Sequence, residues 1–185
     1  MSLRVISGKI KGHKLISVHG DTTRPITDRV KEALFNIIST DIFDALWWDM
    51  FAGTGAVGIE ALSRGAAFVR FTDLNRAPIE TINTNLTLTH LNSQAEVKQA
   101  DAFAVLASNP DKQFHYIYIA PPQYHRLWLK AVNMLEKNIN WLAEDGWVVI
   151  QVSPKEYENL ELEYLEEFDQ RKYGSTLLIF YRRLK

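Results

Sequence analysis

The chain has 185 residues, of which 46% are hydrophobic and 23% charged, and its formal net charge is −1. This length and composition are typical of one globular domain with a sizeable core. The sequence contains no cysteine, which excludes disulfide bonds, thiolate metal sites and a cysteine nucleophile. Because the chain also has no apolar run of about 20 residues that could span a membrane, we expect a cytoplasmic protein.

The charge is distributed unevenly along the chain. Residues 1–36 hold seven Lys or Arg and three Asp or Glu, a net charge of +4, whereas the rest of the chain carries −5. A basic segment of this kind is a candidate for contacts with nucleic-acid phosphates, and a solvated arm is the alternative. The candidate phosphate contacts are Arg4, Lys9, Lys11, Lys14 and Arg24.

The first elements along the chain are a hairpin and a helix. Residues 1–20 contain two short apolar stretches around a tip rich in Gly and Lys, which predicts a basic β-hairpin. In residues 27–39 the apolar side chains recur at helical spacing, and Thr27 precedes them as a candidate N-cap.

From residue 46 onward, patterns typical of strands and helices alternate. The expected strands are 46–51, 68–72, 96–99, 114–120 and 146–152. The expected helices between them are 56–64, 76–90, 102–108 and 127–138. Two further strand-like segments, 161–168 and 175–182, lie on either side of Gly174.

This order predicts a doubly wound α/β fold. Strands that alternate with helices form a mainly parallel sheet with helices on both faces. The two consecutive strands at the end of the chain predict an antiparallel hairpin at one sheet edge. We therefore expect a hairpin appendage over residues 1–20 and one α/β domain over residues 21–185.

A glycine-rich loop marks the candidate cofactor site. Residues 53–58 fit the pattern G-x-G-x-x-G, follow an expected strand and begin an expected helix. Asp73 lies 20 residues after Gly53, at the end of the next strand. Glycines let the backbone approach a ligand, and an acid at this distance accepts hydrogen bonds from ribose hydroxyls. The pattern predicts a cofactor that contains adenosine.

Two further acids favour one such cofactor. Asp49 directly precedes the loop and Asp101 follows the third strand. A carboxylate at Asp49 would repel a pyrophosphate, which disfavours an oxidoreductase with a nucleotide cofactor, but it suits the ammonium of S-adenosylmethionine. The alternatives are that Asp49 orients the loop and that Asp101 only caps the following helix.

Several segments carry a family resemblance. Residues 49–55 resemble the glycine-rich motif of the Rossmann-like class I S-adenosylmethionine-dependent methyltransferases. Residues 24–36, with residues 4–8 and 11–15 before them, resemble the bacterial 16S rRNA (guanine-N2) methyltransferases of the RsmD type. Residues 60–66 and 100–102 also fit, so the resemblance spans nearly the whole chain.

The resemblance implies the site residues and the partners. The implied cofactor-binding residues are Thr27, Arg29, Asp49, Phe51, Ala52, Gly53, Thr54, Gly55, Asp73, Leu74, Asp101 and Ala102. The basic hairpin is expected to bind RNA phosphates. The implied partner is 16S rRNA or an assembly intermediate of the small ribosomal subunit, bound by a monomer. The five histidines have no metal-ligand spacing, so we expect no metal.

The implied catalytic motif departs from the family. After the fourth strand the family carries Asp-Pro-Pro and an aromatic residue, whereas this chain has Ala120, Pro121, Pro122 and Gln123. The Asp accepts a hydrogen bond from the target amine and the aromatic ring stacks on the flipped base. Here the Pro121 carbonyl is left as an acceptor and Tyr124 as a nearby ring. Loss of such an acceptor typically slows a reaction about 10²–10³-fold.

The leading hypothesis is therefore an enzyme that transfers a methyl group to the exocyclic N2 amine of a guanine in 16S rRNA. One alternative is a catalytically impaired homologue that still binds S-adenosylmethionine and RNA, which Ala120 and Gln123 favour. A DNA adenine-N6 methylase is another alternative, because that group also uses a Pro-Pro motif; the basic hairpin and residues 24–36 oppose it.

Overall fold

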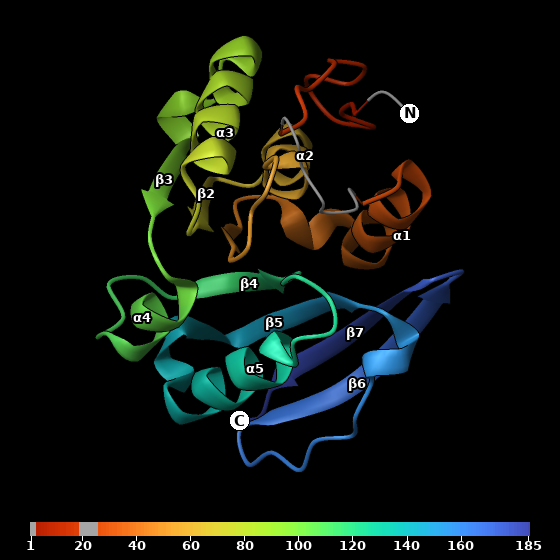
Figure 1. The fold of residues 1–185 in the computed structure, drawn as a ribbon, viewed down its shortest axis with the longest axis vertical. Helices are drawn as coiled ribbons and strands as arrows, with labels where there is room; N and C mark the ends of the chain where they lie inside the picture. Colours follow the sequence, from red (N-terminus) through yellow and green to blue (C-terminus); the bar gives the residue numbers. More distant parts are fainter. Residues whose placement is uncertain (1–2, 19–25) are drawn as a thin grey trace.

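The structure, a computed structural model, describes residues 3–18 and 26–185. Its centre is a seven-stranded sheet with the strand order β3-β2-β1-β4-β5-β7-β6 (Figure 1). The strands are β1 (Leu46–Asp49), β2 (Phe68–Asp73), β3 (Ala95–Gln99), β4 (Phe114–Ile119), β5 (Leu142–Val152), β6 (Leu165–Tyr173) and β7 (Thr176–Arg183). Strands β1 to β5 are parallel, and β7 runs antiparallel to both β5 and β6. The predicted α/β fold with an antiparallel C-terminal hairpin is confirmed.

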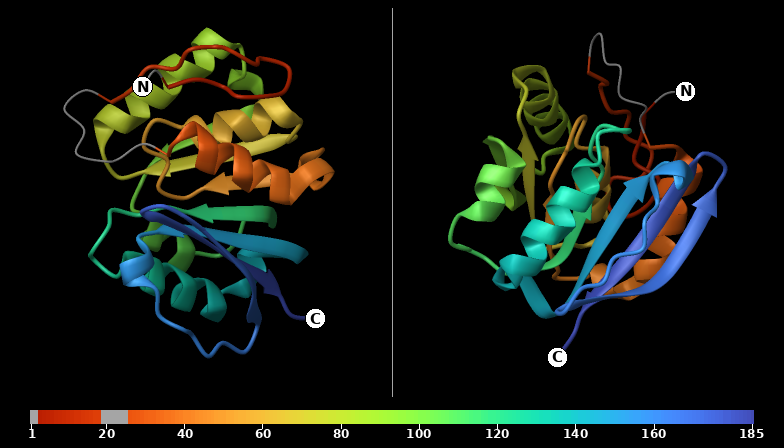
Figure 2. Two further views of the ribbon diagram at one scale, coloured as in Figure 1. Left: turned by 90° about the vertical axis from the view of Figure 1, so that its right-hand side faces the viewer. Right: turned by 60° about the horizontal axis from the view of Figure 1, so that its bottom comes forward.

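Helices cover both faces of this sheet (Figure 2). The α-helices are α1 (Asp28–Ile38), α2 (Ala56–Arg64), α3 (Arg76–Thr89), α4 (Ala102–Ala107) and α5 (Leu127–Lys137). Short 3₁₀ helices lie at Ser39–Ile42, Asn92–Gln94, Ile139–Trp141 and Pro154–Glu156. One hydrophobic cluster joins α1, α2 and α3 to the sheet, and a second joins α4 and α5. Successive strand residues alternate between the two, so the fully buried Trp47 belongs to the first cluster and Trp48 to the second.

The helix ends follow the local chemistry that the sequence indicates. Helix α1 begins after Thr27, whose hydroxyl accepts a hydrogen bond from the Val30 amide. Helix α2 ends at Gly65, which has a φ of 114° that residues other than glycine rarely adopt.

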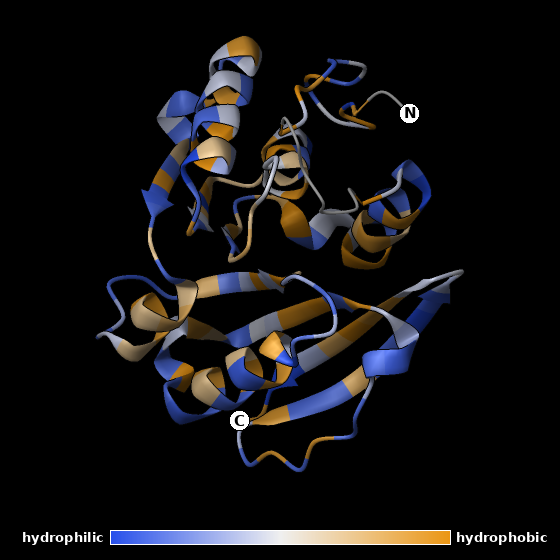
Figure 3. Cartoon of the chain, viewed as in Figure 1, coloured by the Kyte–Doolittle hydropathy of each residue, from blue (hydrophilic) through white to orange (hydrophobic). Residues whose placement is uncertain are grey.

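Two strands differ from their predicted bounds by more than two residues. β5 begins at Leu142 rather than at residue 146. The acidic Glu144 and Asp145 and the following Gly146 interrupt its apolar pattern, and the register with β4 shifts in this part of the strand. β6 covers Leu165–Tyr173 rather than residues 161–168. It is an edge strand and mostly hydrophilic (Figure 3), so the apolar pattern that reveals inner strands is weak there.

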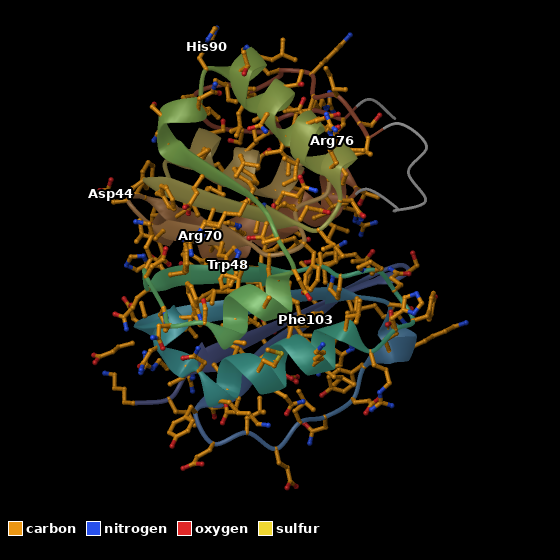
Figure 4. The ribbon with its side chains drawn as sticks, turned by 60° about the vertical axis from the view of Figure 1, so that its left-hand side comes forward. Asp44, Trp48, Arg70, Arg76, His90 and Phe103 are labelled. Atoms are coloured by element: carbon orange, nitrogen blue, oxygen red, sulfur yellow. The ribbon has the colours of Figure 1, made fainter. Side chains whose placement is uncertain are left out.

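A buried arginine fixes the amino ends of the central strands. Arg70 on β2 is fully buried beside its register partner Trp48 on β1 (Figure 4). Its guanidinium donates two hydrogen bonds to Asp111, at 2.7 and 2.8 Å, and one to Glu96, and it lies over the ring of Phe114. Paired in this way, the charge is buried with its donors satisfied.

The N-terminal segment, residues 3–18, folds back on itself. Its hairpin pairing is confined to one β-bridge between Arg4 and Lys14, with backbone hydrogen bonds around it. Val5 and Leu15 are buried in the hydrophobic cluster of α1, α2 and α3. The basic residues of this segment are thus held on an apolar base that belongs to the main core.

Glu60 on α2 is the polar anchor of the N-terminal segment. Its fully buried carboxylate accepts hydrogen bonds from the amides of Ile6 and Ser7, at 2.8 and 2.9 Å, and from Arg64. The buried Lys31 ammonium of α1 lies 3.3 Å away and donates to the Arg4 carbonyl. Burial lowers the pKa of Lys31, and the Glu60 charge opposes that effect.

We expect Glu60→Gln to lower the free energy of unfolding by about 3 kcal/mol, because it leaves the Lys31 ammonium buried without a counter-charge. The matched control is Glu80→Gln, which removes an exposed partner of Arg76 on α3 and should cost less than about 1 kcal/mol. Urea unfolding monitored by tryptophan fluorescence measures both. Equal losses of stability in the two variants would contradict the anchoring role of Glu60.

Candidate functional site

Asp49 ends β1 beneath the glycine-rich loop. Its carboxylate is 1% exposed, and Oδ2 accepts a hydrogen bond of 3.1 Å from the Gly58 amide in the first turn of α2. The other oxygen, Oδ1, is buried and makes no hydrogen bond within the described residues. A buried carboxylate oxygen without a donor is costly, and a ligand donor there would satisfy it.

Burial raises the pKa of Asp49 to about 7. The Gly58 hydrogen bond opposes this shift, and the negative charge of Asp73 adds to it. Asp49 is therefore poised to gain or lose a proton near neutral pH. A cation placed beside Oδ1 would favour the ionised form.

Asp73, at the end of β2, is tied to the same loop. Its Oδ2 accepts a hydrogen bond of 3.0 Å from the Gly53 amide, and its Oδ1 accepts one from Asn75. Gly53 has a φ of 54°, and a Cβ added there would meet no atom within 4 Å. The loop thus leaves open space at its tip, beside a partly exposed carboxylate.

Asp101 follows β3, and two aromatic rings lie near it. Asp101 caps α4 by accepting a hydrogen bond of 2.9 Å from the Phe103 amide, and its contact with a cofactor stays a prediction. Phe103, labelled in Figure 4, meets Phe51 of the glycine-loop segment edge to face at 5.8 Å. Sequence reasoning missed Phe103, although its position in the first turn of α4, after the acid at the strand end, could have indicated it.

The other predicted cofactor-binding residues differ in their exposure to solvent and in the element that carries them. Ala52, Gly55 and Ala102 are buried, Phe51 and Thr54 are partly exposed, and Leu74 is 64% exposed. Thr27 and Arg29 are exposed at the beginning of α1, a different element from the glycine loop. The structure thus gathers the loop residues and the acids at the carboxyl ends of β1, β2 and β3, whereas Thr27 and Arg29 belong to the start of α1.

The Pro-Pro segment follows β4 as an exposed loop. Ala120 and Pro121 are partly or fully buried, whereas Pro122, Gln123 and Tyr124 are exposed. Tyr124 has a φ of 66°, and its amide donates to Glu156 at 2.7 Å. The next turn is tied by an ion pair of 2.9 Å between Arg126 and Glu158. Acidic residues that follow β5 therefore hold this loop in place.

A cavity of about 250 Å³ lies beside that loop. Its walls come from the start of α1, from the Pro-Pro loop, from β5 and from the turn between β6 and β7, whose tip lies near α1 in Figure 1. The lining residues include Thr27, Gln123, Gln151, Tyr173 and Thr176. The cavity joins one predicted cofactor residue, Thr27, to one predicted catalytic residue, Gln123; sequence reasoning missed the other three.

The candidate RNA-binding side chains differ in whether they already have a partner within the protein. Arg4 forms an ion pair of 2.9 Å with Asp28, and Lys9 donates to Gln94. Lys11 and Lys14 are exposed. Arg24 lies outside the described residues.

Comparison with known proteins assigns a family. The model of the family described as "Conserved hypothetical protein 95" matches residues 3–182. The chain is 40% identical to YlbH of Bacillus subtilis, whose proposed activity is rRNA methylation, over 80% of this chain and 82% of YlbH. It is 36% identical to ribosomal RNA small subunit methyltransferase D of Escherichia coli K12, over 80% of this chain and 74% of that protein. The chain belongs to this rRNA methyltransferase family.

Solved structures agree with this fold. The proposed methyltransferase YhhF of Escherichia coli superposes with a TM-score of 0.87 and 30% identity, covering 99% of this chain and 98% of YhhF. An RNA methyltransferase of Salinibacter ruber, in complex with S-adenosylhomocysteine, has a TM-score of 0.65 and 12% identity, covering 86% of this chain and 94% of that one. The second likeness concerns the fold alone, which is that of the class I methyltransferases.

The geometry at α2 fits the cofactor of this fold. A pyrophosphate binds through the free amides of a helix N-terminus, but here the protein's own Asp49 occupies the Gly58 amide. S-adenosylmethionine carries an ammonium and no phosphate, so it suits a site that offers a carboxylate oxygen in need of a donor. This observation favours S-adenosylmethionine over a dinucleotide in this methyltransferase-family chain.

Two other kinds of site find no support. Residues 3–18 and 26–185 contain no group of three or more His, Cys, Asp or Glu side chains that could hold a metal ion. Among the helices that the structure describes, none has the length and apolar character needed to cross a membrane.

We expect Asp49→Asn to stabilise the protein when no cofactor is added, and by roughly 2 kcal/mol more at pH 8 than at pH 5. The raised pKa means that the folded state binds the proton more tightly than the unfolded state. Stability therefore falls as the pH rises from about 4 through about 7, and the amide removes that loss. Urea unfolding at a series of pH values measures it. An advantage of the Asn variant that does not change with pH would show that Asp49 is not the titrating group.

Proposed function

We propose that this protein transfers a methyl group from S-adenosylmethionine to the exocyclic N2 amine of a guanine in 16S rRNA. It acts as a monomer in the cytoplasm, on small-subunit rRNA or on an assembly intermediate of the small subunit. The observation that carries the proposal is the buried Asp49 carboxylate, with one oxygen bound to α2 and the other in need of a donor. The family membership supplies the class of substrate.

The carboxyl ends of three neighbouring strands supply the cofactor contacts in this proposal. Asp49 would take the ammonium, directly or through a water molecule, and Asp73 the ribose hydroxyls. Phe51, Phe103 and the start of α4 would flank the adenine. S-adenosylmethionine, when bound, would supply the methyl group. The amine nitrogen would form the new bond to carbon as the carbon–sulfur bond breaks, S-adenosylhomocysteine would leave, and the proton lost by the amine would pass to water.

The protein's own contribution to the chemistry is to position the amine. The Pro-Pro loop, tied down by Glu156 and Glu158, would present the Pro121 carbonyl to one amine hydrogen. The cavity beside the loop would receive the flipped base. Holding the two reacting groups in line, and away from water, lowers the barrier without a covalent enzyme intermediate.

The N-terminal segment would bind rRNA phosphates through Lys9, Lys11 and Lys14. Such contacts position the substrate without reading its sequence. Glu60 and Lys31 hold the backbone of this segment against α1 and α2. The RNA is thereby placed relative to the same helix, α1, whose start lines the cavity.

We expect replacement of Lys9, Lys11 and Lys14 by Ala to reduce the dependence of RNA affinity on salt. The slope of log K against log salt should fall by about 0.7–0.9 for each phosphate interaction that the substitutions remove. The matched control replaces Lys112, Lys137 and Lys185, which lie at the amino ends of the parallel strands, away from the proposed site. Filter binding over a salt series measures the slopes. An equal change in both triple variants would rule out a specific role for the N-terminal segment.

We expect Ala120→Asp to raise the methyl-transfer rate on undermethylated small subunits by about 10-fold or more, because it restores a side-chain acceptor for the amine. Calorimetry should show little change in the affinity for S-adenosylmethionine. Ala107→Asp, at the exposed end of α4, is the control for added charge.

Two results would contradict this role of position 120. If the wild type is the faster enzyme, the amine is held by another geometry. If both proteins bind cofactor and RNA but neither transfers a methyl group, the protein is a binding homologue and not an enzyme.

A further inference from the structure

Gln151 on β5 carries an amide whose orientation is fixed by a buried neighbour. The Tyr118 hydroxyl on β4 donates a hydrogen bond of 2.6 Å to Gln151 Oε1. Tyr118 is 2% exposed, and burial, together with the Asp49 charge, raises its pKa well above the usual value. The hydroxyl therefore keeps its proton at neutral pH and has it available for the hydrogen bond to Oε1.

This hydrogen bond decides which end of the amide is available to a ligand. Because Oε1 accepts from Tyr118, the amide nitrogen Nε2 is the end left over. Nε2 makes no hydrogen bond within the described residues. Gln151 is partly exposed and lines the cavity beside the Pro-Pro loop. The cavity wall thus presents the Nε2 amide group of Gln151 as a hydrogen-bond donor.

The cavity has the size and lining for a single base. Its volume of about 250 Å³ lies just below the ~300 Å³ at which pockets for drug-sized ligands begin. Tyr173, at the end of β6, is the aromatic residue of the lining, and Thr27 and Thr176 are its threonines. An aromatic wall with a few polar groups is the lining that a flipped base requires.

The donor distinguishes among the bases. On guanine, the O6 carbonyl lies on the same edge as the N2 amine and one ring atom beyond N1, and it accepts hydrogen bonds. Adenine carries an amine at that position, which would face the Gln151 donor without a partner. A base held with its N2 amine at the Pro-Pro loop therefore gains a hydrogen bond from Gln151 only if it is guanine.

We propose that Gln151 is a specificity-determining residue that donates from Nε2 to O6 of the target guanine, with its amide held in that orientation by Tyr118. This inference rests on the proposed function and adds the group that selects guanine.

The test compares guanine with 2-aminopurine, which keeps the N2 amine but lacks O6. The position of the guanine that the wild type methylates is first determined in the small-subunit RNA. Small-subunit RNA is then made by splinted ligation with guanine or 2-aminopurine at that position and assembled into undermethylated subunits. Methyl transfer is measured for the wild type, Gln151→Leu, Tyr118→Phe and the control Gln113→Leu, which is exposed in the loop before β4.

We expect the wild type and Gln113→Leu to prefer guanine about 10- to 100-fold. Gln151→Leu should lose most of that preference through a lower kcat/KM on guanine, with little change on 2-aminopurine. Tyr118→Phe frees the amide to turn, so its preference for guanine should lie between that of the wild type and that of Gln151→Leu. Melting temperature and cofactor affinity, measured on each variant, separate this effect from loss of the fold.

Two outcomes would overturn the inference, and only the second would also reject the proposed function. If the wild type labels guanine but Gln151→Leu keeps the same preference, Gln151 does not read the base and the proposed function stands. If the wild type labels no guanine in the small subunit, both the proposed function and this inference fail.

Discussion

The hydrogen bond from the Gly58 amide to Asp49 is the contact on which the rest of the site depends. It fixes the beginning of α2 directly above the end of β1, and with it the path of the glycine loop between them. It also withdraws from any phosphate one of the amides that a helix N-terminus would offer. The cost is a buried carboxylate with a pKa raised to about 7. A cation bound beside Oδ1 would offset that cost, which adds to the affinity for such a ligand.

Helix α1 connects the two functions that the protein must combine. Its side chain Lys31, paired with Glu60, holds the backbone of the basic N-terminal segment. Its N-cap, Thr27, lines the cavity beside the Pro-Pro loop. In the proposed function, the contacts that would bind the RNA backbone and the pocket that would take one base are therefore fixed to the same helix. The N-terminal segment would then position the RNA without reading its bases, and the pocket would read the target base.

The sequence predicts those features that local chemistry controls. The helix ends at Thr27 and Gly65 follow from capping, and the placement of Asp49 and Asp73 beside the glycine loop follows from their spacing along a βαβ unit. It does not predict the Tyr118–Gln151 hydrogen bond, because that contact joins two strands whose register no local pattern contains. Tyr173 reaches the cavity only because β6 runs longer and later than its weak apolar pattern indicates. The anchoring role of Glu60 is hidden for the same reason, since the Ile6 and Ser7 amides that it binds lie more than 50 residues away in the chain.

The central claim is that a methyl group is transferred to the exocyclic amine of guanine, and the identity of the product tests it most directly. Purified protein is incubated with S-adenosylmethionine and small ribosomal subunits that lack their native methylation, and the RNA is digested to nucleosides for mass spectrometry. We expect one new product, N2-methylguanosine, at one position of the 16S rRNA. The appearance of N6-methyladenosine, or of no methylated nucleoside at all, would contradict the claim.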